Sequence, residues 1–254
     1  MYYLAEPAVS YYIEDNGETI LFDTGYSDVF LSNAKKMGID LAKADHIVLS
    51  HGHNDHSGGL PYLKKVGKRF RLIAHPDAFV KREDDTGLSI GSPMDEESVN
   101  RCFDLSAHTE PYRISEHLIF LGQIKKTLPF EKDYAIGKKY INDKAYEDHI
   151  DDDSALVYTG KEGLFIITGC SHAGICNIIE QAKKVCGQDK IQGVIGGFHL
   201  FDIDERLHKT IDYFEENNIR LLYPCHCVSL GAKIEMGKRL KIHEVGVGLE
   251  LEIE

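Results

Sequence analysis

A short apolar strand leads directly into a histidine cluster in residues 46–59, which read HIVLSHGHNDHSGG. Four side chains of types that bind metals lie within six residues of this stretch: His51, His53, Asp55 and His56. Residues two apart on a helix do not face each other, so we expect a loop here, and Gly52 supplies its freedom. Imidazole nitrogens and carboxylate oxygens suit a borderline cation such as zinc. Because four ligands on one short loop rarely all reach one tetrahedral ion, the cluster predicts two neighbouring ions completed by ligands from elsewhere.

Three more histidines follow predicted strands in the same way. His51 follows strand 46–50, and the further strands 164–168, 193–195 and 220–223 are followed by His172, His199 and His226. Ligands of open α/β sheets lie at the carboxyl ends of the strands. We therefore expect four separate strands to bring histidines to one sheet edge.

Hydrophobic periodicity predicts the elements around these motifs. Residues 10–23 indicate a β-hairpin that turns at 15–17. The other expected elements are strands 71–74, 156–158, 164–167, 194–195 and 219–223, helices 27–38, 174–186 and 203–217, and a helix that opens at 58–61. Residues 77–150 are more charged and less periodic, which indicates an insertion or cap that lines the pocket. The acidic run 147–153, which begins inside this segment and ends just after it, is interpreted as a solvated loop.

Composition restricts the class of protein. The 254 residues are 43% hydrophobic, which is enough for a substantial core, and carry a formal net charge of -12. An acidic chain repels phosphate backbones, so we expect a small-molecule substrate and no nucleic-acid partner. Residues 1–6 have neither a basic region nor a long apolar run, and no stretch approaches the roughly 20 apolar residues of a membrane span. We expect a cytoplasmic protein with reduced thiols and no membrane partner.

The motifs resemble a known family. The run from His51 to His56 is similar to the His-x-His-x-Asp-His signature of the metallo-β-lactamase superfamily. Residues 21–25, 168–174 and 196–200 resemble the branch grouped with the dihydropterin ribofuranosyl-aminobenzene phosphate synthase family of methanopterin biosynthesis. The likeness covers nearly the whole chain. It implies an α+β fold, a four-layer αβ/βα sandwich with the metal site at the sheet edge, formed by residues 1–254 as a single domain.

The resemblance also implies a ligand set. By motif position, the first metal would be held by His51, His53 and His172. The second would be held by Asp55, His56 and His226. Asp23 is interpreted as a structural residue near the ligand loop. The implied cofactors are two divalent ions, with zinc favoured and manganese or iron as alternatives.

The chain departs from the family pattern at two places. Many members have a bridging aspartate where this chain has Gly-Gly-Phe-His at 196–199, with no acid until Asp202. His199 is therefore a candidate ligand, substrate contact or proton donor, and occupancy of the second metal site is open. Relatives usually have an extra strand before the segment that matches residues 5–14, so either the sequence is incomplete or the sheet lacks an edge strand.

These features predict a metal-dependent hydrolase acting on a small phosphorylated or ester-type substrate. Asp55 would orient the attacking water and accept its proton, and His199 would stabilise the developing oxyanion. The alternatives are a mononuclear iron oxidoreductase of the persulfide dioxygenase kind and a non-catalytic metal-dependent ligand sensor. Cys225 and Cys227 are interpreted as buried structural thiols, and metal chemistry makes a nucleophilic role for Cys170 unnecessary.

Overall fold

The computed structural model describes residues 2–131 and 133–254, which divide into two compact units. Unit 1 consists of the residues up to Thr109 together with Tyr134–Asp152, and unit 2 consists of Glu110–Asp133 and Asp153–Glu254. Met1 and Lys132, the second of which falls in the predicted 77–150 insertion, lie outside the described residues. Residues of that predicted insertion contribute to both units.

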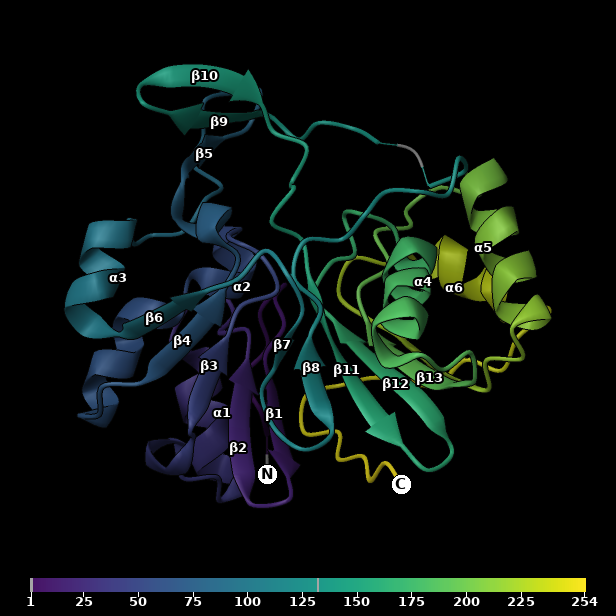
Figure 1. Cartoon of the computed structure of the whole chain (residues 1–254), viewed down its shortest axis with the longest axis horizontal. Helices are drawn as coiled ribbons and strands as arrows, with labels where there is room; N and C mark the ends of the chain where they lie inside the picture. Colours follow the sequence, from purple (N-terminus) through teal and green to yellow (C-terminus); the bar gives the residue numbers. More distant parts are fainter. Residues whose placement is uncertain (1, 132) are drawn as a thin grey trace. The chain divides into compact units, whose positions relative to one another are not determined.

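Unit 1 is built on a five-stranded sheet in the order β1-β2-β3-β4-β6 (Figure 1). Its strands are β1 Tyr11–Asp15, β2 Glu18–Phe22, β3 His46–Val48, β4 Arg71–Ala74 and β6 Asp104–Ala107. The predicted hairpin is confirmed, because β1 pairs antiparallel with β2 across a turn in which Gly17 has a positive φ. Strands β2, β3, β4 and β6 are parallel, so their carboxyl ends share one edge.

The helices of unit 1 cover a core of apolar residues that includes Phe30, Leu60 and Val99. They are α1 Val29–Met37, α2 Asn54–Ser57 and α3 Glu96–Cys102, with 3₁₀ turns at Leu41–Lys43, Leu60–Val66 and Pro76–Phe79. Gly38 ends α1 in the left-handed conformation, as the sequence predicts. The prediction that the whole histidine cluster is a loop was wrong, because its second half forms the single turn of α2.

A small antiparallel sheet also belongs to unit 1, in the order β10-β9-β5. Its strands are β5 Lys81–Glu83, β9 Lys138–Ile141 and β10 Lys144–Glu147. The middle residue of β5, Arg82, is fully buried, which is unusual for arginine. Its partners connect this sheet to the histidine cluster, as described below.

Unit 2 contains a six-stranded sheet in the order β14-β13-β12-β11-β8-β7. Its strands are β7 Tyr112–Arg113, β8 Leu118–Phe120, β11 Ala155–Gly160, β12 Gly163–Thr168, β13 Ile191–Gly196 and β14 Leu221–Pro224. Helices α4 Ile175–Cys186, α5 Glu205–Glu216 and α6 Leu230–Met236 pack against it through residues such as Ile178, Phe214 and Met236 (Figure 1). The predicted helices 174–186 and 203–217 are thus confirmed with slightly shorter bounds. Strands β12, β13 and β14 are parallel, so their carboxyl ends also meet at one edge.

None of the helices in the described part of the chain is both long and apolar enough to cross a lipid bilayer.

Candidate metal centre

The potential ligands of unit 1 lie just beyond the carboxyl end of β3. His51 follows the strand by three residues, His53 precedes the first residue of α2, and Asp55 lies in its first turn. One ligand atom from each of these three residues lies within 4.8 Å of the others. The ring of His51 is 4.7 Å from that of His53 and 4.2 Å from that of His56, measured between centroids. Within unit 1, the side chains that the sequence singled out as candidate ligands thus lie close together.

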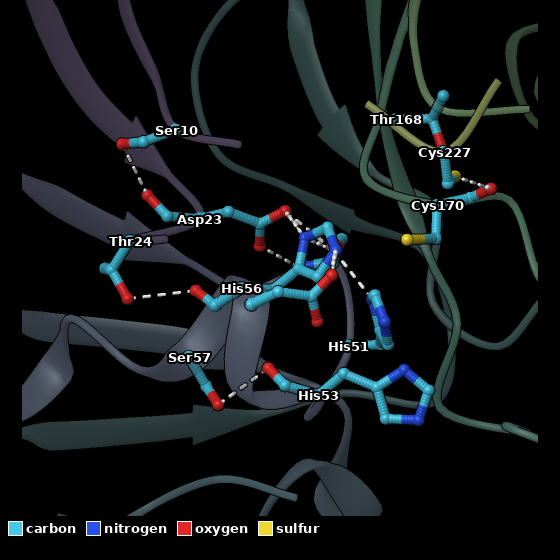
Figure 2. Close-up of polar contacts among 12 residues, drawn as sticks. Ser10, Asp23, Thr24, His51, His53, His56, Ser57, Thr168, Cys170 and Cys227 are labelled. Atoms are coloured by element: carbon cyan, nitrogen blue, oxygen red, sulfur yellow. Dashed lines mark hydrogen bonds and ion pairs between the residues drawn. The ribbon is translucent and has the colours of Figure 1, made fainter. Parts of the chain in front are cut away.

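Asp23 supports this cluster from the neighbouring strand end. It follows β2 with a φ of 60°, a left-handed conformation rarely adopted by residues other than glycine. Its fully buried carboxylate accepts hydrogen bonds from the backbone N–H and the hydroxyl of Ser50, both at 2.7 Å. The Nδ1 atom of His56 lies 2.7 Å from the same carboxylate (Figure 2). An Nδ1–H directed at Asp23 leaves Nε2 of His56 as the ligand atom, an arrangement typical of metal-binding histidines.

The charges around His56 favour a cation at this position. Burial disfavours the imidazolium form, but the carboxylates of Asp55 and Asp23 outweigh burial and raise the pKa of His56 well above its ordinary value. Nε2 of His56 lies 3.4 Å from Asp55, and both nitrogens of the ring thus face a carboxylate. The two carboxylates that face the ring give this position a negative potential, which also favours a metal cation.

A buried ion-pair network holds the start of the cluster. The backbone N–H of Gly52 donates to Asp152 at 2.8 Å, and Asp152 accepts a second bond from Arg82 at 2.6 Å. Arg82 also donates to Asp148 at 2.7 Å, and all three side chains are fully buried. The interpretation of run 147–153 as a solvated loop was therefore wrong for Asp148, Asp152 and Asp153, because all three side chains are buried.

Gly52 itself is required by close packing. A Cβ atom at this position would lie 1.9 Å from the carbonyl oxygen of Ala78 and 2.3 Å from Nη1 of Arg82. The backbone between His51 and His53 is thus pressed against the network that binds it. Gly52 serves close approach rather than the loop freedom that the sequence suggested.

The potential ligands of unit 2 lie at the carboxyl edge of β12, β13 and β14. His172, His199 and His226 follow these three strands by two to four residues, as predicted. The prediction that His51 shares their sheet edge was wrong, because β3 belongs to a different sheet. His199 and His226 have positive φ values of 48° and 52°. The rings of His172 and His199 are 4.5 Å apart, and the ring of Phe201 packs edge-on against His199 at 4.9 Å. Left-handed non-glycine residues are costly and gather at functional sites, which agrees with a role for this edge.

The loop that carries His172 is held by side chains of unit 2. The backbone N–H of Ala173 donates to Asp153 at 2.9 Å. Ser171, with a φ of 61°, donates from its hydroxyl to the carbonyl oxygen of Gly197 at 2.6 Å. The Sγ of Cys170 lies within 4.8 Å of a ring nitrogen of His172, and also of one of His226.

Several of these supporting residues were not found from the sequence. Arg82 and Asp152 are 70 residues apart, and a run of acids offers no sign of which members are buried. Arg206, which donates from Nη1 to the carbonyl oxygen of His199 at 3.3 Å, carried no signal either. Cys225 is buried as predicted, but Cys227 is only half-buried, and its sulfur contacts the carbonyl oxygen of Cys170 at 3.4 Å (Figure 2).

The donor set of unit 1 fits a divalent metal. Two buried imidazoles and a carboxylate converge on one point, and a carboxylate orients a further imidazole from behind. The fold and this set define an α+β protein with a candidate metal centre at the carboxyl ends of its strands. The chain belongs to the metallo-β-lactamase superfamily, whose profile matches residues 4–181.

Relatives agree with this assignment. The chain is 33% identical, over 87% of its length and 80% of the relative, to 7,8-dihydropterin-6-methyl-4-(beta-D-ribofuranosyl)-aminobenzene-5'-phosphate synthase of Methanocaldococcus jannaschii. It is also 33% identical to an uncharacterized protein of the same organism, over 93% of this chain and 89% of that protein. A crystal structure of a metal-dependent hydrolase of the beta-lactamase superfamily superposes with a TM-score of 0.80 at 32% identity, covering 94% and 93% of the two chains. The predicted α+β metallo-β-lactamase fold and the resemblance to the synthase branch are confirmed.

Proposed function

We propose that this protein is a metal-dependent hydrolase of a small phosphorylated or ester-type substrate. The observation that carries the proposal is the convergence of His51, His53 and Asp55 within 4.8 Å, beside the Asp23–His56 pair. The similar protein of solved structure is a metal-dependent hydrolase, and the similar synthase is named for a 5'-phosphate compound, which supports a phosphorylated substrate.

The proposed ligands are those that the family motifs imply. They are His51, His53 and His172 for one divalent ion, and Asp55, His56 and His226 for a second, with zinc as the favoured metal. When bound, such ions lower the pKa of a water and polarise an acyl or phosphoryl oxygen. The residues of the chain then orient the reactants.

Asp55 is proposed to hold the attacking water and to accept its proton. Its side chain is 18% exposed, so water reaches it, whereas the carboxylate of Asp23 is fully buried and occupied by Ser50 and His56. The two carboxylates therefore have different proposed roles. Asp23 positions an imidazole, and Asp55 accepts the proton of the attacking water.

His199 is proposed to donate to the oxygen that gains negative charge. Its ring lies 4.5 Å from that of His172 and contacts the ring of Phe201, and its carbonyl oxygen accepts a hydrogen bond from Arg206. A donor that is already oriented stabilises a developing oxyanion without reorganisation during the reaction.

The test combines metal analysis with turnover. Protein purified without chelator is analysed for bound metals and assayed with aryl phosphomonoesters, aryl phosphodiesters and aryl acetates. Two divalent ions per chain and turnover of one substrate class are expected. General-base losses are typically about 10²–10⁴-fold, so Asp55→Asn should lose at least about 100-fold in kcat while the exposed control Asp85→Asn keeps wild-type activity. A metal-loaded Asp55→Asn protein with near-wild-type turnover contradicts the role of Asp55.

His199→Ala separates two roles for this residue in the same assay. If His199 is a donor, the variant keeps both metals and loses turnover. If it is a ligand, the metal count drops towards one. A metal-free wild-type protein refutes the proposed function altogether.

A further inference from the structure

A thiol lies close to two of the proposed imidazole ligands in unit 2. Cys170 follows β12 by two residues, and its Sγ lies within 4.8 Å of a ring nitrogen of His172 and of one of His226. The two histidines come from loops that are 54 residues apart in the chain, after β12 and β14 (172 against 226). A sulfur atom and a nitrogen atom within 4.8 Å of each other can both contact one zinc-like ion, at about 2.0–2.3 Å each, after small side-chain rotations. We propose that Cys170 is a thiolate ligand of a metal ion held with His172 and His226 in unit 2, an inference that rests on the proposed function.

Several contacts fix the backbone of the loop around Cys170. The hydroxyls of Thr168 and Ser171 lie 3.0 Å apart, and Ser171 adopts a left-handed backbone conformation directly after the cysteine. The backbone N–H of Gly197 donates to the carbonyl oxygen of Gly169 at 2.8 Å, which ties the loop to the end of β13. Strained backbone of this kind persists where surrounding contacts impose it, and it is concentrated at ligand-holding sites.

The other cysteines do not share this setting. Cys225 and Cys227 flank His226, but neither belongs to a close group of potential ligands in the described part of the chain. Cys227 instead contacts the Cys170 carbonyl through its sulfur, at 3.4 Å. Cys225 and Cys227 are conspicuous in the sequence because they flank His226. Cys170, however, is the cysteine that lies close to two imidazoles.

A thiolate ligand also helps to balance the positive charge of a bound metal ion. Within unit 2 the proposed ligands His172 and His226 are imidazoles, which in their neutral form do not offset the charge of a divalent ion. No acidic residue follows β13 until Asp202. A thiolate at Cys170 adds an anion beside these imidazoles, and a bound metal deprotonates a coordinating thiol.

Thiolate ligation also restricts the metal. Soft sulfur donors select zinc or other late transition metals over magnesium, calcium and manganese, which prefer oxygen ligands. The inference therefore predicts a centre that takes up zinc or cobalt(II) and discriminates against manganese.

Cobalt(II) is the probe, because a cobalt–thiolate bond produces an intense charge-transfer band in the near ultraviolet. Nitrogen and oxygen ligands do not produce this band. The full chain is stripped of metal, loaded with cobalt(II), and compared with Cys170→Ser and with the control Cys227→Ser. The band is expected in the wild type and in Cys227→Ser and absent in Cys170→Ser. Loss of an outer contact already costs about 10–100-fold in metal affinity, so Cys170→Ser should weaken zinc binding at least about 100-fold in a chelator competition.

A second measurement needs no variant. The X-ray absorption spectrum of the zinc-loaded wild type should show a sulfur neighbour of zinc at about 2.3 Å. Cobalt binding without a charge-transfer band, or a band that survives in Cys170→Ser, overturns the inference and leaves the proposed hydrolase intact. Failure of the wild type to bind any metal overturns both.

Discussion

The buried carboxylate of Asp152 offers the sharpest test of how the first ligand loop is held. The substitution Asp152→Asn keeps the shape of the side chain but removes its charge. It leaves the buried guanidinium of Arg82 with Asp148 as its remaining carboxylate partner, and an amide cannot accept from Arg82 and Gly52 as strongly as a carboxylate does.

The magnitude follows from the burial of both partners. Breaking a buried ion pair typically costs about 3–5 kcal/mol, because one charge is left uncompensated. Here burial raises the pKa of Asp152 even though Arg82 opposes this, so desolvation already offsets part of the attraction. Since Arg82 also keeps Asp148, we expect a loss of about 2 kcal/mol in the free energy of unfolding.

The adjacent residue provides a matched control. Asp151 is 40% exposed and pairs with Lys139 at 3.0 Å, so Asp151→Asn should cost less than about 1 kcal/mol. Urea unfolding of both variants, followed by circular dichroism, measures the difference. Zinc affinity should also fall about 10–100-fold in Asp152→Asn alone, since the N–H of Gly52 loses its charged acceptor. Equal unfolding midpoints for the two variants would refute the reasoning and restore the solvated-loop interpretation.

Three further predictions concern other buried groups. Gly52→Ala should destabilise the protein by about 3 kcal/mol in urea unfolding, because its Cβ would overlap the carbonyl oxygen of Ala78, while Gly246→Ala, with open space around it, should be near neutral. Asp23→Ala should remove three hydrogen bonds and lower zinc affinity about 10–100-fold in a chelator competition, and unchanged affinity would contradict its supporting role. Burial raises the pKa of Glu131, so the native state retains a proton that the unfolded state releases, and stability falls as pH rises through the native pKa. The thermal midpoint of Glu131→Gln should therefore depend less on pH above the ordinary glutamate range, and parallel pH profiles would exclude this explanation.

Much of the fold could be predicted because its signals are local. Alternation of apolar and polar residues identified the first hairpin, and apolar runs with period 3.6 identified α4 and α5. The positions of His51, His172, His199 and His226 after strands were also readable, because a strand that ends before a polar residue directs it to the sheet edge.

What the sequence by itself determined is the family, the strands that deliver the histidines, and the cluster His51–His56. These depend on spacing within short segments, where neighbours in sequence are neighbours in space. Only the tertiary structure decided which members of the acidic run are buried, which arginine neutralises them, and that Cys170 rather than Cys227 lies between His172 and His226. The pairings of Arg82 and Gly52 with these acids join residues 66–100 positions apart, and they form only after folding has removed the charges from water.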